Sequence, residues 1–322
     1  MKTMTARIFI DGAVGTTGLR IHQRLAGRGD VEVVSLPEAE RKDVFARAGM
    51  LNGCDLAILC LPDDAAREAV GMIENDDVRV IDASTAHRVA DGWVYGFPEL
   101  NAGRNGQIAE AKRVANPGCY ALASVAMIHP LVSAGLLPAG HPLILNAVSG
   151  CSGGGRKMIE NYEDPDSSDY TEAAFRVYGL GLEHKHVPEI QRHGGLETRP
   201  LFVPGVGRFH QGMIVQLPLQ LWSLPGKPSP GDVHGILSDH YGGRALVDVA
   251  GLEDAAAMAG LEPEGMNGTD ALRLYVFANE AEGQAVVMAL IDNLGKGAAG
   301  QAVQNMNLML GLPETAGLRA GA

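Results

Sequence analysis

Short apolar runs alternate with amphipathic stretches along the first part of the chain. Residues 17–29 carry Leu19, Ile21 and Leu25 at helical spacing, and residues 62–75 begin with acidic residues and continue with apolar positions at helical spacing. Apolar runs of strand length stand at residues 6–12, 31–36, 55–61 and 78–84. Strands that alternate with helices predict a parallel sheet, with ligands bound beyond the carboxyl ends of its strands.

The pattern changes in the second half, where longer strand-like runs and glycine-rich loops appear. Residues 143–150 and 213–222 have the pattern of strands, and residues 273–297 predict two further strands joined by a turn. Residues 298–312 again have apolar positions at helical spacing. These patterns indicate a second domain with a different architecture from the first.

We therefore predict an α/β protein. Its first domain is expected to hold a Rossmann-type, doubly wound parallel sheet over residues 1–118, completed by residues 295–322 as a helix that returns to this domain. Residues 119–294 are expected to form an α+β domain for catalysis and oligomerisation.

Composition and charge narrow the class of protein. Hydrophobic residues make up 46% and charged residues 20%, as in ordinary folded proteins. A formal charge of -12 gives no general basic surface for nucleic acid or anionic membrane, so an anionic substrate would need a local basic pocket. Neither a signal-peptide hydrophobic region nor a membrane-length apolar run is present. We expect a cytoplasmic protein that acts on a small molecule.

The four cysteines show no metal-binding pattern. Cys54, Cys60, Cys119 and Cys151 include no Cys-x-x-Cys pair and no nearby histidine at zinc-ligand spacing, so no metal site or disulfide framework is expected. Cys54 and Cys60 flank an apolar run and are interpreted as core thiols. The sequence leaves the role of Cys151 open.

A glycine-rich loop follows the first predicted strand. The segment "IDGAVGTTGLRI" places Gly12, Gly15 and Gly18 between this strand and its helix, with Thr16 and Thr17 among them. Glycines let the backbone approach a pyrophosphate, and the helix N-terminus supplies N–H groups and partial positive charge. The loop predicts a dinucleotide site, while a purely structural glycine turn is the alternative reading.

The end of the second predicted strand indicates which dinucleotide binds. Folds that bind NAD commonly carry an acidic residue there for the ribose hydroxyls, but this chain has Ser35, followed by Arg41 and Lys42. A hydroxyl with nearby cations suits a 2′-phosphate, so we predict NADP(H) rather than NAD. The alternative for Arg41 and Lys42 is a solvated helix face.

The segment "VANPGCYAL" places Cys119 at the start of an apolar helix. We expect Asn116 to be the N-cap and Pro117 to take the first helical position. A helix N-terminus lowers the pKa of a thiol and increases its thiolate fraction. Cys119 is thus a candidate nucleophile, and a small buried cysteine is the alternative.

Two histidines accompany this candidate. In "GLEHKHVPEI", His184 and His186 stand two residues apart, and in an extended segment both rings would point to the same side. One imidazole could act as acid/base and the other as a substrate ligand, which nucleophilic catalysis by a thiol requires. The sequence does not order the two.

These motifs together resemble a known family, the N-acetyl-gamma-glutamyl-phosphate reductases, NADP-dependent enzymes of arginine biosynthesis related to aspartate-semialdehyde dehydrogenase. The resemblance extends from about residue 6 to residue 312 and is carried by the following segments: "DGAVGTTGLRI", "AILCLPDDAA", "NPGCY", "SGCSGGGRK", "EHKHVPEI" and "DNLGKGAAGQAVQNMN". They are similar to the shorter of the family's two forms.

The resemblance implies roles for further residues. Cys119 would be the nucleophile and one of His184 and His186 the acid/base. Arg88 in "DASTAHRV" would hold the acyl phosphate, and Asn116 is taken as a second substrate-binding residue. Three residues would lie near the nicotinamide, although they can also be read as ordinary turn residues: Ser152, Gly153 and Asn293.

The implied reaction is reduction of N-acetyl-gamma-glutamyl phosphate by NADPH through a cysteine thioester, in a homodimer or homotetramer. The same chemistry on an aspartyl or aminoadipyl type of acyl phosphate remains open, because such relatives share the motifs. An NADPH-sensing binding protein is the alternative from another class. A short-chain reductase is set aside, because no tyrosine is followed four residues later by lysine.

Overall fold

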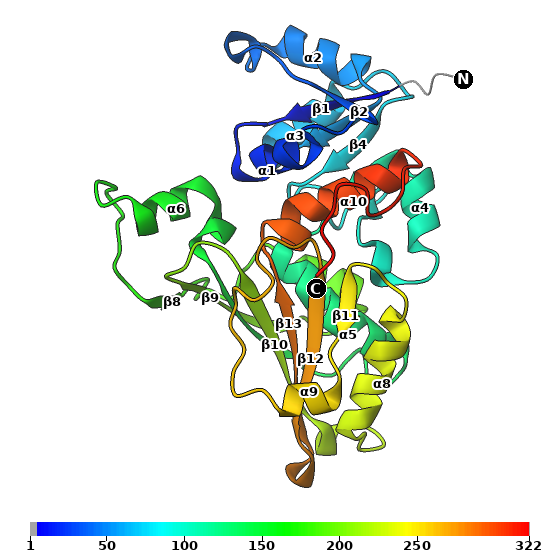
Figure 1. Cartoon of the computed structure of the whole chain (residues 1–322), viewed down its shortest axis with the longest axis vertical. Coiled ribbons are helices and arrows are strands. Elements are labelled where there is room, and N and C mark those ends of the chain that lie inside the picture. Colours follow the sequence, from blue (N-terminus) through cyan, green and yellow to red (C-terminus); the bar gives the residue numbers. More distant parts are fainter. Residues whose placement is uncertain (1–4, 322) are drawn as a thin grey trace. The chain divides into compact units, whose positions relative to one another are not determined.

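The computed structural model describes residues 5–321, which form two units (Figure 1). The first unit comprises the chain up to Pro98, Ala102–Pro117 and Ala298–Leu318. The second comprises Glu99–Asn101, Gly118–Gly297 and the chain from Arg319 onward. Glu99–Asn101 thus belongs to the second unit although the residues on both sides belong to the first, and the sequence pattern did not predict this crossing.

The first unit is built on a parallel sheet with strand order β2-β1-β3-β4-β6-β5. The strands are β1 (Ala6–Asp11), β2 (Val31–Val34), β3 (Leu56–Leu59), β4 (Arg79–Asp82), β5 (Val94–Tyr95) and β6 (Arg113–Ala115). The chain runs from β1 outward in one direction and then from β3 in the other. The loops after β1 and β3 therefore border the position where doubly wound sheets bind ligands.

Helices cover both faces of this sheet, as the alternation of its side chains requires. The helices are α1 (Thr16–Leu25), α2 (Val44–Gly53), α3 (Asp63–Gly71), α4 (Arg104–Glu110) and α10 (Gly300–Met309). Ile8 and Ile10 of β1 lie in one core with Ile21 of α1 and with buried residues of α4 and α10. Phe9 points to the other face and packs in a core with Leu51 of α2 and with α3.

The two cysteines that flank β3 pack against these opposite cores. Cys54 is buried on the α2 side, and Cys60 packs, partly buried, against the α1 side. Burial raises the pKa of Cys54 to about 11 and that of Cys60 to about 12. Both thiols therefore stay protonated near neutral pH, in line with the interpretation of Cys54 and Cys60 as structural residues.

The second unit contains a mixed sheet with strand order β11-β12-β13-β10-β7-β9-β8. Its strands are β7 (Ile144–Ser149), β8 (Phe175–Val177), β9 (Leu201–Gly207), β10 (Met213–Gln220), β11 (Val247–Val249), β12 (Leu272–Asn279) and β13 (Gln284–Ile291). The pairs β7–β9 and β11–β12 are parallel, and the others are antiparallel. The predicted combination of a Rossmann-type domain and an α+β domain is confirmed.

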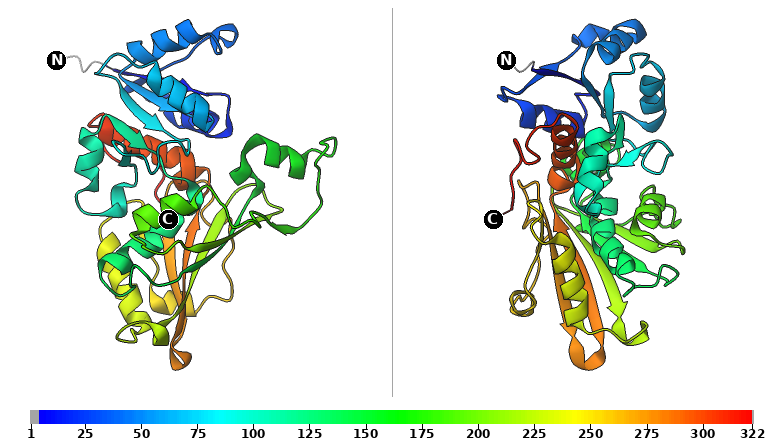
Figure 2. Two further views of the ribbon diagram at one scale, coloured as in Figure 1. Left: turned by 180° about the vertical axis from the view of Figure 1, so that it is seen from behind. Right: turned by 90° about the vertical axis from the view of Figure 1, so that its right-hand side faces the viewer.

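Helices of the second unit are α5 (Cys119–Ser133), α6 (Gly155–Glu163), α7 (Val187–Gly194), α8 (Pro230–Tyr241) and α9 (Leu252–Ala256). Helix α5 packs on β10 and β13, and α8 packs on β11 and β12 and runs along the strands in the right-hand view of Figure 2. Helix α5 is buried on nearly all sides. Among residues 5–321, no helix has both the length and the apolar character needed to cross a membrane.

A buried ion pair anchors the carboxyl end of β1. Asp11, the last residue of β1, accepts hydrogen bonds from Nε and Nη2 of Arg47 in α2, at 3.2 and 2.9 Å. The two side chains are only 10% and 8% exposed. A second pair, between Arg67 and Asp64 on α3, is widely exposed.

The two pairs predict different effects on stability. Arg47→Met leaves a buried carboxylate without its cation and should lower the free energy of unfolding by about 3 kcal/mol. Arg67→Met, the control, should change it by less than about 0.5 kcal/mol. Urea unfolding of the first unit, followed by Trp93 fluorescence in a chain with Trp222→Phe, measures both. Equal losses in the two variants would contradict this prediction.

Candidate active site

Glycines in the loop after β1 are required by close backbone contacts. Gly12 has a φ of +87°, and a Cβ there would lie 2.3 Å from the carbonyl oxygen of Cys60. A Cβ at Gly18 would lie 2.5 Å from the carbonyl oxygen of Gly12. Side chains are thus excluded where the loops after β1 and β3 meet. Steric packing alone therefore requires glycine at these two positions, in addition to the predicted role of the loop in ligand binding.

The start of α1 fits a bound pyrophosphate. Gly15 is the N-cap and has no side chain to accept from the first turn, so the helix begins at Thr16 and Thr17 without a side-chain cap. Uncapped N–H groups and the positive end of the helix suit an anionic ligand. The residues present therefore fit the phosphates of a dinucleotide, with Thr16 and Thr17 at the amino end of the helix.

The loop after β2 presents the predicted cations at the same edge of the sheet. Ser35 follows the last residue of β2, and β2 pairs in parallel with β1, so both loops leave the sheet at its carboxyl edge. Ser35, Arg41 and Lys42 are all exposed. Their exposure is compatible both with contacts to a 2′-phosphate and with a solvated surface.

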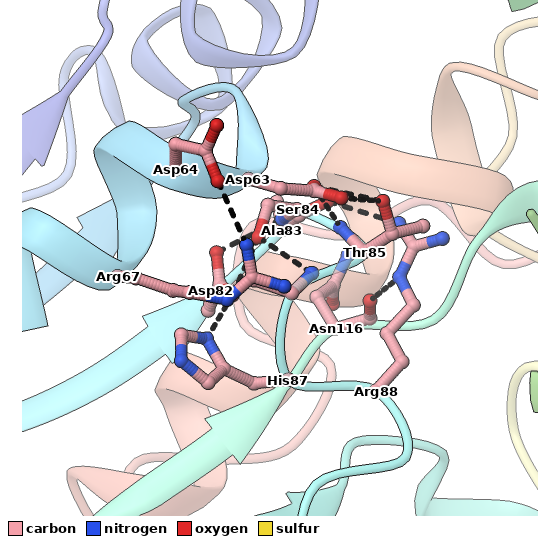
Figure 3. A network of polar contacts seen from close by, with 11 residues as sticks. Asp63, Asp64, Arg67, Asp82, Ala83, Ser84, Thr85, His87, Arg88 and Asn116 are labelled. Atoms are coloured by element: carbon pink, nitrogen blue, oxygen red, sulfur yellow. Dashed lines mark hydrogen bonds and ion pairs between the residues drawn. The ribbon is translucent and has the colours of Figure 1, made fainter.

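The loop after β4 is organised by a buried carboxylate (Figure 3). Asp82 is fully buried and accepts hydrogen bonds from the backbone N–H and the hydroxyl of Ser84, at 2.9 and 2.7 Å. Nδ1 of His87 lies 2.6 Å from Oδ2 of Asp82, and its ring stacks on Trp93. These contacts fix the path of the chain that leads to Arg88.

Backbone carbonyl groups orient Arg88. Its Nε donates to the carbonyl oxygen of Asn116 at 3.0 Å, and its Nη2 donates to that of Ala83 at 2.9 Å. Arg88 is 9% exposed and lies in the loop after β4 (Figure 3). These two carbonyl groups fix the direction of the guanidinium, a group whose planar set of donors suits a phosphate ligand.

The prediction that Asn116 caps the following helix is wrong. The N-cap is Gly118, and Cys119 rather than Pro117 is the first helical residue of α5. The side chain of Asn116 instead donates to the carbonyl oxygen of Ala298 at 3.1 Å and accepts from Nδ2 of Asn305 at 3.0 Å. Long-range partners therefore take the amide that local sequence assigns to a cap.

Backbone groups pack closely around Cys119. The N–H of Gly118, directly before it, donates to Oε1 of Glu189 in α7 at 2.9 Å. A Cβ at Gly297 would lie 2.9 Å from the Cβ of Cys119, so only glycine allows this approach. Glu189 is 1% exposed, and neither it nor Gly297 was predicted as a site residue, although both lie within the motifs "EHKHVPEI" and "DNLGKGAAGQAVQNMN".

The two histidines lie next to the residue that follows Cys119, but not in an extended segment. His186 is the N-cap of α7 in helical conformation, so the expected extended geometry is wrong. A turn brings the two rings together instead, with centroids 4.8 Å apart. Tyr120 contacts both rings edge-on, at 5.8 Å from His184 and 5.9 Å from His186. Both imidazoles thus lie against Tyr120, the residue that follows Cys119 at the start of α5.

Burial fixes the protonation of His184. Burial, with a smaller contribution from Lys185, lowers the pKa of His184 to about 4. The backbone N–H of His186 donates to Nδ1 of His184 at 3.2 Å, which requires Nδ1 to be unprotonated. The imidazole is therefore neutral at physiological pH, with its hydrogen on Nε2.

Tyr120, the residue after the candidate nucleophile, is held by hydrogen bonds. The hydroxyl oxygen of Tyr120 lies within hydrogen-bond distance of both the Ser149 hydroxyl oxygen and the Gly205 carbonyl oxygen, at 3.0 Å each. Burial raises the pKa of Tyr178 to about 12, and the charge of the Cys119 thiolate contributes to this rise. Both phenols remain neutral, so the surroundings of Cys119 are polar but uncharged on this side.

The predicted nicotinamide residues come together in the second unit. Asn293 accepts from the N–H of Gly212 at 2.7 Å and donates to the hydroxyl of Ser152 at 3.0 Å. A Cβ at Gly153 would lie 2.9 Å from the Ser149 hydroxyl oxygen. Ser152 and Asn293 are almost fully buried, so their mutual hydrogen bond holds the loop in one conformation.

Comparison with family models gives the class of protein. Residues 7–108 match the model described as semialdehyde dehydrogenase, NAD binding domain, and residues 119–293 match semialdehyde dehydrogenase, dimerisation domain. The two matches divide the chain where the Rossmann-type and mixed sheets divide it. They define a dehydrogenase of the semialdehyde type.

Curated relatives narrow this class. N-acetyl-gamma-glutamyl-phosphate reductases from Brucella anthropi and Brucella suis are each 55% identical over 309 residues, which cover 96% of this chain. The match covers 99% and 100% of their own lengths, respectively. The chain therefore belongs to the N-acetyl-gamma-glutamyl-phosphate reductase family, as the sequence motifs predict.

Solved structures agree with the fold. Aspartate semialdehyde dehydrogenase II from Vibrio cholerae, complexed with ASA, superposes with a TM-score of 0.70 at 14% identity, over 95% of this chain and 98% of that one. A probable aspartate-semialdehyde dehydrogenase from Pseudomonas aeruginosa gives 0.71 at 18% identity, over 95% and 99%. At such low identity the likeness concerns the architecture alone.

The protonation of His184 can be measured directly. Its ring NMR signals, assigned by their loss in His184→Asn, should stay constant from pH 8 to about pH 5.5 and move only toward a midpoint of about 4. Burial disfavours the imidazolium, so the folded pKa lies below the ordinary value of about 6.5. A midpoint near 6.5 would contradict the neutral state assigned to His184.

Proposed function

We propose that the protein reduces N-acetyl-gamma-glutamyl phosphate to N-acetylglutamate semialdehyde and phosphate with NADPH, through a thioester on Cys119. The observation that carries this proposal is the thiol at the first residue of α5, with two imidazoles in contact with the next residue, Tyr120. A thiol at a helix N-terminus next to acid/base groups is the arrangement that nucleophilic acyl transfer requires.

The first half of the reaction forms the thioester. The Cys119 thiolate attacks the acyl carbon, the carbon–oxygen bond to phosphate breaks, and phosphate leaves with that electron pair. N–H groups at the start of α5 stabilise the oxyanion that develops on the carbonyl oxygen. Arg88, oriented by two carbonyl groups, is the proposed cation for the phosphate group.

The second half releases the aldehyde. NADPH, when bound, supplies the hydride that reduces the thioester carbonyl. Collapse of the resulting thiohemiacetal breaks the carbon–sulfur bond and regenerates the Cys119 thiolate. Ser152, Gly153 and Asn293 are the proposed residues on the nicotinamide side, because their hydrogen bonds make one rigid loop.

We assign different tasks to the two histidines. His184 is neutral and carries its hydrogen on Nε2, so it is suited to donate a hydrogen bond to a developing oxyanion. Its low pKa makes it a weak base, so the transfer of protons to and from the reacting groups falls to His186. Glu189 is a positioning residue, because its carboxylate accepts a hydrogen bond from the backbone N–H of Gly118, the residue before Cys119.

The glycine loop and the loop after β2 are the proposed NADP site. Gly12, Gly15 and Gly18 keep the approach to α1 clear, and Thr16 and Thr17 offer the N-terminal N–H groups to the phosphates. Ser35, Arg41 and Lys42 supply a hydroxyl and two cations for the 2′-phosphate. We propose that the protein acts in the cytoplasm, where the NADPH that the reaction consumes is available.

A dimer through the second sheet is the proposed assembly. A shallow hollow of about 680 Å³ on this sheet is lined largely by apolar residues, among them Ile144, Pro218, Phe277 and Val286. Ile144 is 48% exposed. Trp222, which precedes the lining residue Ser223, is 58% exposed. The match of residues 119–293 to a dimerisation domain supports burial of this face in a partner. A tetramer would pair two such dimers.

Two other functions compete with this proposal. Reduction of an aspartyl or aminoadipyl phosphate would use the same thiol chemistry, and the 55% identity to the Brucella enzymes favours the acetylglutamyl substrate. A sensor that binds NADPH without turnover would not need a thiol beside two histidines.

The reverse reaction tests the substrate and the nucleophile together. Wild-type protein should reduce NADP with N-acetylglutamate semialdehyde only when phosphate is present, followed by absorbance at 340 nm, and Cys119→Ala should lose at least about a thousandfold of this activity. NADPH affinity should be unchanged in the variant. Activity with aspartate semialdehyde alone would point to the related acyl phosphate, and full activity of Cys119→Ala would refute the thioester.

Cofactor choice tests the loop after β2. The double substitution Arg41→Ala with Lys42→Ala should raise the KM for NADPH by at least about tenfold and leave that for NADH nearly unchanged, because only NADPH carries the 2′-phosphate. Lys112→Ala is the matched control, an exposed lysine just before β6 and so at the opposite edge of the sheet. An equal rise for both cofactors would remove Arg41 and Lys42 from the phosphate site.

A further inference from the structure

Three side chains that have no role in the proposed reaction bring a sulfur, a nitrogen and an oxygen donor together. Cys151 opens a short 3-10 turn (Cys151–Gly154), Glu163 is the last residue of α6, and His210 lies between β9 and β10. One donor atom from each lies within 4.8 Å of the other two. Oε1 of Glu163 is 3.6 Å from Sγ of Cys151 and 2.6 Å from Nδ1 of His210.

The backbone fixes two of these residues against each other. The N–H of Cys151 donates to the carbonyl oxygen of Phe209 at 2.9 Å, and the N–H of Ser152 donates to that of His210 at 3.0 Å. A Cβ at Gly150 would lie 2.4 Å from the carbonyl oxygen of His210, so glycine is needed for this approach. The thiol and the imidazole therefore start from a fixed framework, which lowers the entropic cost of gathering them around a ligand.

The surroundings give the thiol one polar side. Tyr162 and Val206 pack against Cys151 in a small apolar cluster, and the residue is 2% exposed. The side chains of His210 and Glu163 are 44% and 48% exposed, so solvent reaches the cluster from their side. An ion can enter there and meet the sulfur on an apolar wall, where few waters compete for it.

We propose that Cys151, Glu163 and His210 bind Zn²⁺, or a divalent transition-metal ion of similar preference, through three protein ligands. Tetrahedral zinc with bonds of about 2.0–2.3 Å places its ligands roughly 3–4 Å apart, close to the separation of these donors. A thiolate, an imidazole and a carboxylate together favour zinc over magnesium or calcium, which prefer oxygen alone. A water completes the fourth position.

Binding exchanges one set of contacts for another. The Cys151 thiol releases its proton to solvent as the zinc–sulfur bond forms. Nδ1 of His210, which carries a hydrogen while it lies against Glu163, loses this hydrogen as the ring changes tautomer to Nε2–H by exchange with solvent, and Nδ1 then gives its lone pair to the ion. The carboxylate of Glu163 offsets one unit of the ion's charge. Cys151 lies 12 residues before Glu163 and 59 before His210, and such separations are why local spacing along the chain predicts no metal site.

Cobalt provides a probe that reports the sulfur ligand. Metal-free, untagged protein with Cys119→Ser, which removes the candidate catalytic thiol, is titrated with Co²⁺ and followed by thiolate-to-cobalt charge-transfer absorption. We expect a saturable band of tetrahedral cobalt that Zn²⁺ abolishes. In this background Cys151→Ser should abolish the band, and Glu163→Gln and His210→Gln should each weaken binding by at least about tenfold.

Controls separate a site from adventitious binding. Cys54→Ser in the same background should leave the titration unchanged, because Cys54 is a buried residue of the first unit and the cluster belongs to the second. Zn²⁺ should raise the thermal midpoint of the Cys119→Ser protein and not that of the variant that also carries Cys151→Ser. Absence of the band, or its persistence after Cys151→Ser, would overturn the proposal, and neither readout depends on the proposed enzymatic activity.

Discussion

The close packing of backbone at the start of α5 is the constraint on which the chemistry of the second unit depends. Gly297 comes so near to Cys119 that a single added carbon would lie 2.9 Å from the cysteine Cβ. Glu189 takes the N–H of the preceding glycine, and Tyr120 lies edge-on to His184 and His186. Three segments that are far apart in sequence therefore hold the short stretch of backbone that carries Cys119. Their side chains and backbone place the thiol at the positive end of a helix while the nearby phenols stay neutral, so the electrostatic environment follows from packing rather than from a dedicated charge.

The first unit uses a similar principle around a charge. The buried carboxylate of Asp82 collects a backbone N–H, a hydroxyl and an imidazole from residues immediately after β4. This local network fixes the loop that leads to Arg88, whose guanidinium then rests on two carbonyl oxygens. Orientation of the cation is complete before any ligand arrives, so little side-chain entropy remains to be lost on binding phosphate. Residues with no proposed contact to substrate thus orient the residue that is proposed to bind the phosphate.

Periodicity and turn chemistry were sufficient for the architecture, because strands and helices are specified by nearby residues. The glycine loop, the thiol in the first turn of α5 and the pairing of the two histidines were also predictable from short motifs. The two errors have different causes. Asparagine is a common N-cap residue, but the side-chain amide of Asn116 forms hydrogen bonds with Ala298 and Asn305, almost 200 residues later in the sequence. His184 and His186 were assigned to an extended segment although Pro188 and Glu189, in the first turn of α7, are local signals of a helix start. The ion pair of Asp11 with Arg47 and the cluster around Cys151 likewise depend on tertiary proximity, which spacing along the chain does not contain.

The last helix of the fold has a consequence for synthesis of the chain. Helix α10 contributes four buried residues to the core that contains Ile8 and Ile10 of β1, namely Ala302, Val303, Met306 and Met309. On a ribosome, the apolar face of the first sheet is translated first and its cover nearly last, after the whole second unit has been made. That face stays without its final layer during elongation, whereas the second unit can assemble from a nearly continuous stretch. Truncation before α10 is therefore expected to expose this apolar face and to leave an aggregation-prone sheet rather than a smaller stable domain.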